Sequence, residues 1–353
     1  MIVRQFLLWM RTASAAQRAN ATHALARVYL YSDLSPDDRA AAESALVTVL
    51  DDPSPKVRGA LAQALAFSES SPSAAILGLA ADQPEVACWV LEHSPLLVDA
   101  DLIDAVATGG PAAQAAIANR ANLPASVSAA IAEVGAAEAC LVLIENPRTA
   151  IATFSLDRII ARFGHLGAIR EAMLACDDLP AASRQALVAK LSETLAGFVA
   201  AREWLEPRRA AHVAKDACER ATVALAAASS ASEMVPLVRH LRESGQLTAG
   251  LILRALLSGN VDLFQHALAE LSGLPPKRVS ALMRAYRSAS FRALYGRAGL
   301  PPSTYLGFRE ALQAVHEGGF IDASGRSTAL KRRIVERCLR AARTSGSKMS
   351  NRR

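Results

Sequence analysis

Aromatic residues and cysteines are scarce in this sequence, and the motifs of common enzymes are missing from it. Phe, Trp and Tyr make up 5% of the 353 residues, and the five cysteines stand singly, with no CxxC pair. The seven histidines show no HExxH or other metal-ligand spacing, and there is no GxSxG nucleophile elbow. The sequence therefore predicts no catalytic residue, no cofactor site and no metal site. Single cysteines are also typical of a protein in the reducing cytoplasm.

The apolar residues that the sequence does contain favour helices. They amount to 52% of the chain and are mainly Ala, Leu and Val, a composition that packs as closely spaced helices more readily than as sheet. The amino-terminal segment Ile2–Met10 is apolar, but Arg4 and Arg11 leave it too short for an export signal or a membrane span. We expect a helix docked on the first repeat there, with a membrane-touching anchor as the alternative. The predicted fold class is all-α.

A proline-centred turn followed by an apolar helical stripe recurs along the first half of the chain. Its clearest copy reads Asp51-Asp52-Pro53-Ser54-Pro55-Lys56-Val57-Arg58. Asp52-Pro53 ends one helix, Ser54 is a natural N-cap, and Pro55 fits the first position of the next helix. A weaker copy follows at Asp82 to Val86. This pattern predicts a stack of short helical hairpins.

The spacing of the turns is uneven. The intervals between Pro53, Pro84, Pro124 and Pro147 are 31, 40 and 23 residues. HEAT-like arrays have units of about 40 residues and commonly carry an Asp-Pro turn followed by Val-Arg on the second helix. We therefore predict an irregular HEAT-like α-solenoid followed by a second helical domain. The residues expected to form its repeat turns are Asp52, Pro53, Val57, Arg58, Asp82, Pro84 and Val86.

Charge divides the chain into two halves. Residues 1–197 carry 14 Lys and Arg against 21 Asp and Glu, a net charge of −7, and residues 198–353 carry 25 against 12, a net charge of +13. Such asymmetry favours two different functional surfaces, because the basic half attracts anions and the acidic half repels them. We predict an acidic repeat domain over 1–200, a basic helical domain over 201–343 and a disordered tail over 344–353.

Clusters of basic residues in the second half are candidates for contact with an anion or a nucleic acid. One group is interleaved with Tyr286, Phe291 and Tyr295, and the other forms a stripe on one helix. Cations beside aromatics can hold phosphates and stack bases, but the same mix arises when aromatics face the core and arginines face water. Contact with an acidic protein or a lipid headgroup, and a plain solvated face, are the alternatives. The candidates are Lys277, Arg278, Arg284, Arg287, Arg333, Arg337 and Arg340.

Two weaker hypotheses concern single residues. His93 lies at a helix end and turn, where a capping or packing role is expected and a ligand or phosphohistidine role is the alternative. HEAT-like alkylpurine DNA glycosylases resemble this chain in being all-helical, basic arrays that use a carboxylate and aromatics. Trp204 and Asp216 are the residues that such an activity suggests, although the recognisable repeats fall in the acidic half.

The motifs of the chain resemble an uncharacterised bacterial family, domain of unknown function 2336. The segments that carry the resemblance are Phe6-Leu7-Leu8-Trp9, Ala24-Leu25-Ala26-Arg27, Tyr31-Ser32-Asp33-Leu34, Asp51 to Arg58, Leu79 to Ala87, Ser94-Pro95-Leu96-Leu97 and Ile117-Ala118-Asn119-Arg120, with looser similarity around Gly245-Gln246-Leu247-Thr248 and Ala267-Leu268-Ala269. The resemblance implies a cytosolic helical-repeat protein and supplies no catalytic residues.

Together these observations predict a non-catalytic interaction scaffold or regulatory protein. Its solenoid surface is expected to bind one or more protein partners, because preformed helices and exposed edges suit that role. The alternative is a nucleic-acid-binding protein that uses the basic helices of the second half. No integral membrane segment is expected.

Overall fold

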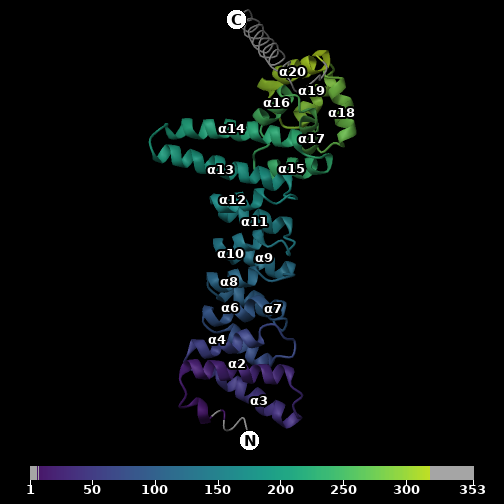
Figure 1. The fold of residues 1–353 in the computed structure, drawn as a ribbon. Helices are drawn as coiled ribbons and strands as arrows, with labels where there is room; N and C mark the ends of the chain where they lie inside the picture. Colours follow the sequence, from purple (N-terminus) through teal and green to yellow (C-terminus); the bar gives the residue numbers. More distant parts are fainter. Residues whose placement is uncertain (1–5, 7, 319–353) are drawn as a thin grey trace, which may run out of the picture. The chain divides into compact units, whose positions relative to one another are not determined.

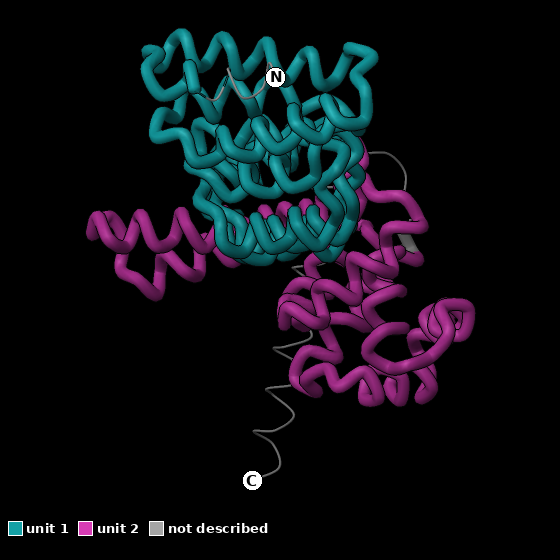
Figure 2. The backbone as a smooth tube through the Cα atoms, turned by 90° about the horizontal axis from the view of Figure 1, so that it is seen from below, with its two compact units in different colours: residues 1–176 teal, residues 177–353 magenta. Residues whose placement is uncertain are grey.

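The computed structural model describes residue 6 and residues 8–318 of the chain, and it is helical wherever it has regular secondary structure. The described residues confirm the predicted all-α fold. The chain divides into two compact units, residues 1–176 and residues 177–353 (Figure 2). None of the described helices combines the length and the apolar content that crossing a bilayer requires.

Unit 1 consists of short helices joined by tight turns (Figure 1). The helices are α2 (Ala15–Tyr31), α3 (Pro36–Thr48), α4 (Pro55–Leu65), α5 (Ser73–Ala80), α6 (Pro84–His93), α7 (Asp99–Thr108), α8 (Pro111–Ala118), α9 (Ala125–Val134), α10 (Ala137–Glu145), α11 (Thr153–Phe163) and α12 (Gly167–Leu174), with a short 3-10 turn at Val49–Asp51. The helix expected over Ile2–Met10 lies largely outside the described residues.

The helices of unit 1 stack in two layers. In one layer α2 packs on α4, α4 on α6, α6 on α8, α8 on α10 and α10 on α12, while in the other α3 packs on α5, α7 on α9 and α9 on α11. Each successive pair of helices therefore adds one hairpin to the stack, which is the arrangement of an α-solenoid. We call the layer that contains α4, α6 and α8 the even layer.

The repeat is more regular than the prolines indicate. Helices α4, α6, α8, α10 and α12 begin at residues 55, 84, 111, 137 and 167, so their starts are 29, 27, 26 and 30 residues apart. The intervals between the prolines are uneven because the prolines occupy different positions in the helical hairpin. Pro124 precedes α9, which is not in the even layer, and Pro147 lies in the turn after α10. The hairpins are thus shorter than the unit of about 40 residues that the HEAT comparison predicts.

The turn before α4 forms much as its sequence predicts. Pro55 occupies the first turn of the helix, and Val57, Leu61 and Leu65 are fully buried on its inner face. The cap differs in one respect. Ser54 is the N-cap residue but its hydroxyl makes no capping hydrogen bond. Instead, the Ser54 backbone N–H donates to the Asp52 carboxylate at 2.8 Å, so Asp52 organises the turn.

Arginine side chains tie neighbouring hairpins of unit 1 together. The guanidinium of Arg18 donates to both carboxylate oxygens of Asp52 at 2.7 and 2.9 Å. Arg58 pairs in the same bidentate way with Asp82 at 2.5 and 2.9 Å, and it also donates to the Asp52 carbonyl. Further along, Arg120 donates to the carbonyls at the end of α6, and Arg162 donates to those at the end of α9. Within unit 1, the residues of the repeat turn thus connect one hairpin to the next.

Unit 2 has longer helices at its start and a separate core. Its helices are α13 (Ala181–Ala201), α14 (Pro207–Ala228), α15 (Ala231–Glu243), α16 (Ala249–Leu257), α17 (Val261–Ser272), α18 (Pro276–Arg284), α19 (Ala289–Arg297) and α20 (Tyr305–Gly318), with a 3-10 turn at Pro302–Thr304. Phe264, Phe291 and Phe308 are fully buried, and the rings of Phe264 and Phe308 stack at 5.9 Å.

The boundary between the units falls between Cys176 and Asp177 rather than at residue 200. Helix α13 belongs to unit 2 because it packs on α14 and α15. Its buried Gln185 also joins three segments: the side-chain amide donates to Gln246 at 2.6 Å and to Thr222 at 3.4 Å, and its oxygen lies 3.0 Å from His240 Nε2. The predicted tail over 344–353 lies outside the described residues.

Candidate functional site

An exposed cluster of rings lies on the even layer of unit 1. Phe67 lies in the turn after α4, one residue beyond the C-cap Ala66, and is 66% exposed, while Trp89 on α6 is 38% exposed. His93, the last residue of α6, stacks on Phe67 with ring centroids 4.5 Å apart, and its ring lies 6.3 Å from that of Trp89. We call Phe67, Trp89 and His93 the aromatic cluster. It joins two consecutive hairpins of the solenoid.

The sequence of α6 explains why these side chains face outward. Val86, Ala87, Val90 and Leu91 are buried and form the inner face of the helix. Trp89 and His93 are four residues apart, so they share a different face of the helix. The end of α6 is fixed as well, because the guanidinium of Arg120 donates to the backbone carbonyls of Leu91 and Ser94. The rings are therefore presented by a rigid support.

Two glutamates of α6 lie on the same side of the helix as Trp89. The Glu92 carboxylate lies 3.8 Å from His93 Nε2 and accepts a hydrogen bond from Asn119 at 2.6 Å. Glu85 precedes Trp89 by one helical turn and is exposed. Unit 1 as a whole is acidic, since residues 1–176 carry 12 Lys and Arg against 18 Asp and Glu, a net charge of −6. An apolar surface with an acidic rim fits a partner that has apolar and basic side chains.

Sequence reasoning placed His93 in a packing or capping role and overlooked Phe67 and Trp89. His93 does pack, on Phe67. The residues of the described chain include no group of three or more His, Cys, Asp or Glu that could hold a metal ion. The sequence contains one signal for Trp89. This large aromatic residue falls one helical turn after the charged Glu85, and it lies between Val86 and Val90 without belonging to the buried face that they form.

The basic candidates that the structure describes in unit 2 lie on the surface, whereas the aromatic residues with which they alternate are buried. Lys277, Arg278 and Arg284 are exposed on α18, and Arg287 follows in the next turn with its guanidinium 5.4 Å from the Tyr286 ring. Tyr286, Phe291 and Tyr295 are buried in the core. These three rings are thus not available to stack on bases. Arg333, Arg337 and Arg340 lie outside the described residues.

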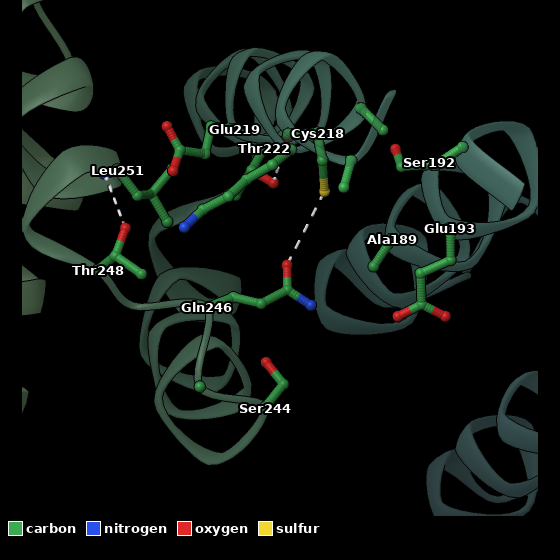
Figure 3. A pocket seen from close by; sticks show the side chains of 15 residues that line it. Ala189, Ser192, Glu193, Cys218, Glu219, Thr222, Ser244, Gln246, Thr248 and Leu251 are labelled. Carbon is green, nitrogen blue, oxygen red and sulfur yellow. Dashed lines mark hydrogen bonds between the residues drawn. The ribbon is translucent and has the colours of Figure 1, made fainter. Parts of the chain in front are cut away.

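A pocket of about 340 Å³ opens in unit 2 between α13, α14 and the turn that precedes α16 (Figure 3). Gln246 reaches into it, and its side-chain oxygen accepts from Gln185 Nε2 at 2.6 Å and from the Cys218 thiol at 3.9 Å. Burial raises the pKa of Cys218, so at neutral pH this residue is a protonated thiol and a poor nucleophile. The rest of the wall combines small residues, mainly alanine and serine, with the charged residues Glu193, Lys215 and Glu219.

The two residues suggested by the glycosylase comparison lie apart. Trp204 is in the turn between α13 and α14, where its ring meets that of Phe198 edge-on at 5.8 Å. Asp216 lies more than two turns into α14 and is held in ion pairs with Arg254 and Arg220. The structure brings no carboxylate and aromatic pair together from these residues.

The stacked hairpins and their exposed ring cluster place the protein among helical-repeat proteins. The chain belongs to a family described as an uncharacterised protein conserved in bacteria (DUF2336), whose model matches residues 86–346. This confirms the predicted family. The match begins at Val86, so the motifs between Phe6 and Arg58 lie outside it, and the second half carries more of the similarity than those motifs suggest. No curated protein and no solved structure matches the chain.

Proposed function

We propose that this chain is a non-catalytic scaffold of the bacterial cytoplasm and that its solenoid unit binds a protein partner at the aromatic cluster. The observation that supports this most strongly is the exposure of Phe67 and Trp89 on two consecutive hairpins. Large aromatic side chains at a surface are the residues that contribute most to protein interfaces. The stack of Phe67 on His93 also fixes the rings before a partner arrives, which reduces the entropy lost on binding.

The partner is expected to present an apolar anchor flanked by Lys or Arg. The anchor would cover Phe67 and Trp89, and the cations would face Glu85 and Glu92. Electrostatic complementarity of this kind mainly raises the association rate and selects the partner, while the buried rings supply most of the affinity. Binding is therefore expected to weaken only moderately with added salt.

The first prediction concerns the double variant Phe67→Ala/Trp89→Ala. A library of displayed peptides from bacterial proteins is selected on the full chain, and the affinity of the enriched peptides is measured by fluorescence anisotropy. We expect the double variant to bind these peptides at least 10-fold more weakly, a loss of about 1.4 kcal/mol or more. The matched control is Phe154→Ala, because Phe154 on α11 is 64% exposed, almost the same as Phe67.

Folding of the double variant is checked by its thermal transition, which should stay near that of the unmodified chain because both side chains are exposed. Peptides that bind the double variant and the unmodified chain equally well would contradict the proposed site. Selection of peptides without Lys or Arg would contradict the proposed partner chemistry.

Nucleic-acid binding by unit 2 is a second candidate, supported by one specific observation. Residues 271–309 contain seven Lys and Arg and no Asp or Glu. Lys277, Arg278 and Arg284 of this segment share the exposed side of α18, opposite the buried Val279 and Met283. Uncompensated cations on one helix attract a phosphate backbone without regard to its base sequence.

The second prediction tests this candidate through salt dependence. If the full chain binds labelled duplex or single-stranded DNA, changing Lys277, Arg278 and Arg284 together to Ala should reduce the slope of log K against log salt by about 2 to 3. The matched control is Arg208→Ala/Arg209→Ala/Lys215→Ala on α14, which removes the same charge from another exposed helix. Absence of binding at low salt, or an equal effect of both triple variants, would exclude α18 as the contact.

A further inference from the structure

The acidic excess of unit 1 is concentrated around the aromatic cluster. Between Arg58 and Arg120 the chain contains no Lys or Arg but seven Asp and Glu, a net charge of −7, whereas unit 1 as a whole carries −6. The two arginines that bound this stretch have structural roles, Arg58 in its ion pair with Asp82 and Arg120 at the carbonyls that end α6. The exposed rings therefore lie in a negative field, and their own stretch of sequence supplies no Lys or Arg to cover them.

Trp89 lies between the carboxylates of α6 and the other two rings. Successive residues of a helix turn by roughly 100°, so Glu85 and Glu92 fall on one side of Trp89 around the helix axis. His93 falls on the other side, where Phe67 stacks on it. A side chain placed over the indole would thus meet hydrogen-bond acceptors on one side and an aromatic surface on the other.

Two observations place the carboxylates beside Trp89. One oxygen of Glu92 accepts a hydrogen bond from the Asn119 side-chain amide at 2.6 Å, which orients the carboxylate and leaves its second oxygen to accept from a ligand. Burial raises the pKa of the Cys88 thiol, and the negative charges of Glu92 and Glu85 raise it further. Both carboxylates therefore lie near the residue that precedes Trp89 on α6.

Helix α10 has the same two glutamates without the ring. Glu138 and Glu145 occupy its second and ninth positions, which are the positions of the two glutamates in α6, and both helices bury their third, fourth, seventh and eighth residues. At the sixth position α10 has Val142, whereas α6 has Trp89. The pair of carboxylates thus recurs in the even layer, and the combination with an aromatic ring distinguishes α6 from α10.

We propose that the aromatic cluster binds an arginine side chain of the partner, with the guanidinium flat on Trp89 and its N–H groups directed to Glu85 and Glu92. This inference rests on the proposed function and names the residue by which the partner is recognised. The apolar stem of the arginine packs towards Phe67, because long cationic side chains cover apolar surface while their charged ends reach polar groups.

Arginine fits this site better than other cations. Its planar head stacks on an aromatic face while its fork of N–H groups pairs with carboxylates, whereas a lysine ammonium is a compact and strongly hydrated point charge. A trimethylated lysine also binds aromatic rings, but it has no N–H group to donate to the glutamates. In the described part of the chain, six contacts place a cation over a ring, and arginine supplies the cation in all six.

Two displayed libraries of short peptides test the inference on the full chain. They share the same apolar residues and differ only at their basic positions, which are arginine in one library and lysine in the other. Binders should come from the arginine library. When each arginine of an enriched peptide is changed in turn to lysine, one such change should raise the dissociation constant, measured by fluorescence anisotropy, about 10-fold or more. Citrulline, which keeps the shape of arginine without its charge, and trimethyllysine should weaken binding at that position at least as much.

Matched variants of the chain test the other side of the contact. Glu85→Gln/Glu92→Gln removes the charged acceptors and should weaken binding of the arginine peptide by about 10-fold. The control Glu138→Gln/Glu145→Gln removes the same charge from the equivalent positions of α10 and should leave the affinity unchanged. Trp89→Val gives α6 the residue of α10 and should abolish the preference for arginine over lysine. The thermal transition of each variant verifies that it folds.

The outcomes separate this inference from the proposed site. Peptides that need Phe67 and Trp89 but bind equally well with arginine or lysine would overturn the arginine inference and leave the partner site standing. An equal effect of the two double Gln variants would also overturn it, because general attraction to an acidic surface would then explain the binding. If neither library yields a binder, or if binders tolerate the loss of both rings, the proposed site and the arginine inference are overturned together.

Discussion

Replacing Arg58 by alanine is expected to lower the free energy of unfolding of unit 1 by about 3 kcal/mol, because the change leaves a buried carboxylate without its partner. The Arg58 and Asp82 side chains are only 15% and 13% exposed, and they form two charge-assisted hydrogen bonds. Arg58 also satisfies the Asp52 carbonyl in the preceding turn. Loss of one side chain thus disturbs two turns of the solenoid.

The effect of Arg58→Ala should depend on pH. The hydrogen bond from Arg58 holds the pKa of Asp82 below its ordinary value of 3.8. A carboxyl with a lowered pKa stabilises the folded state fully above that ordinary value, and this contribution is lost as the pH falls through the folded-state pKa. Urea unfolding should therefore show a large difference between the variant and the unmodified chain at pH 7 and a smaller one at pH 3. Lys56→Ala, an exposed change in the same helix, should have little effect at either pH.

An equal loss of stability at pH 7 and pH 3 would show that Arg58 acts through contacts that do not depend on pH, such as its hydrogen bond to the Asp52 carbonyl, and not through the Asp82 carboxylate. No loss at pH 7 would contradict the role assigned to the ion pair.

A fragment that begins at residue 201 is expected to lose the cooperative fold of unit 2, whereas a fragment that begins at residue 177 should keep it. The shorter fragment lacks α13, which packs along α14 and α15 and supplies the buried Gln185 and Leu187. Without it, Thr222 and Val223 of α14 become exposed, and Gln246 and His240 lose their side-chain partner. The free energy lost with several such interactions is expected to exceed the free energy of unfolding of a domain of this size.

Thermal unfolding followed by circular dichroism separates the two fragments. The fragment of residues 177–353 should melt in one cooperative transition, and that of residues 201–353 should aggregate or melt at least about 10 °C lower. Equal cooperative transitions for both would contradict the boundary at Cys176–Asp177 and restore a boundary near residue 200.

The sequence predicted the parts of the fold that depend on local patterns. Pro55 at the start of a helix and the buried face of Val57, Leu61 and Leu65 follow from capping rules and helical periodicity alone. The period of the repeat did not follow from the prolines, because a proline starts helices in both layers and only the stacking separates them. The division at Cys176–Asp177 could not be read from the sequence either, since α13 and α14 have similar alanine-rich compositions and only packing assigns α13 to unit 2.

The candidate site was harder to predict for the same reason. Phe67 and Trp89 are 22 positions apart in the sequence, and they approach each other only because α4 packs on α6. Nothing local distinguishes an exposed Phe at the end of a helix from a buried one. By contrast, the surface position of Lys277, Arg278 and Arg284 could be predicted, because they alternate with Val279 and Met283 on α18.

The most direct test of the proposed partner site is hydrogen–deuterium exchange of the full chain with and without a peptide selected on it. We expect slower exchange in the peptide complex over the end of α4 and along α6, including Phe67 and His93, and no change in unit 2. Protection confined to α18, or to unit 1 away from α4 and α6, would contradict the assignment of partner binding to the aromatic cluster.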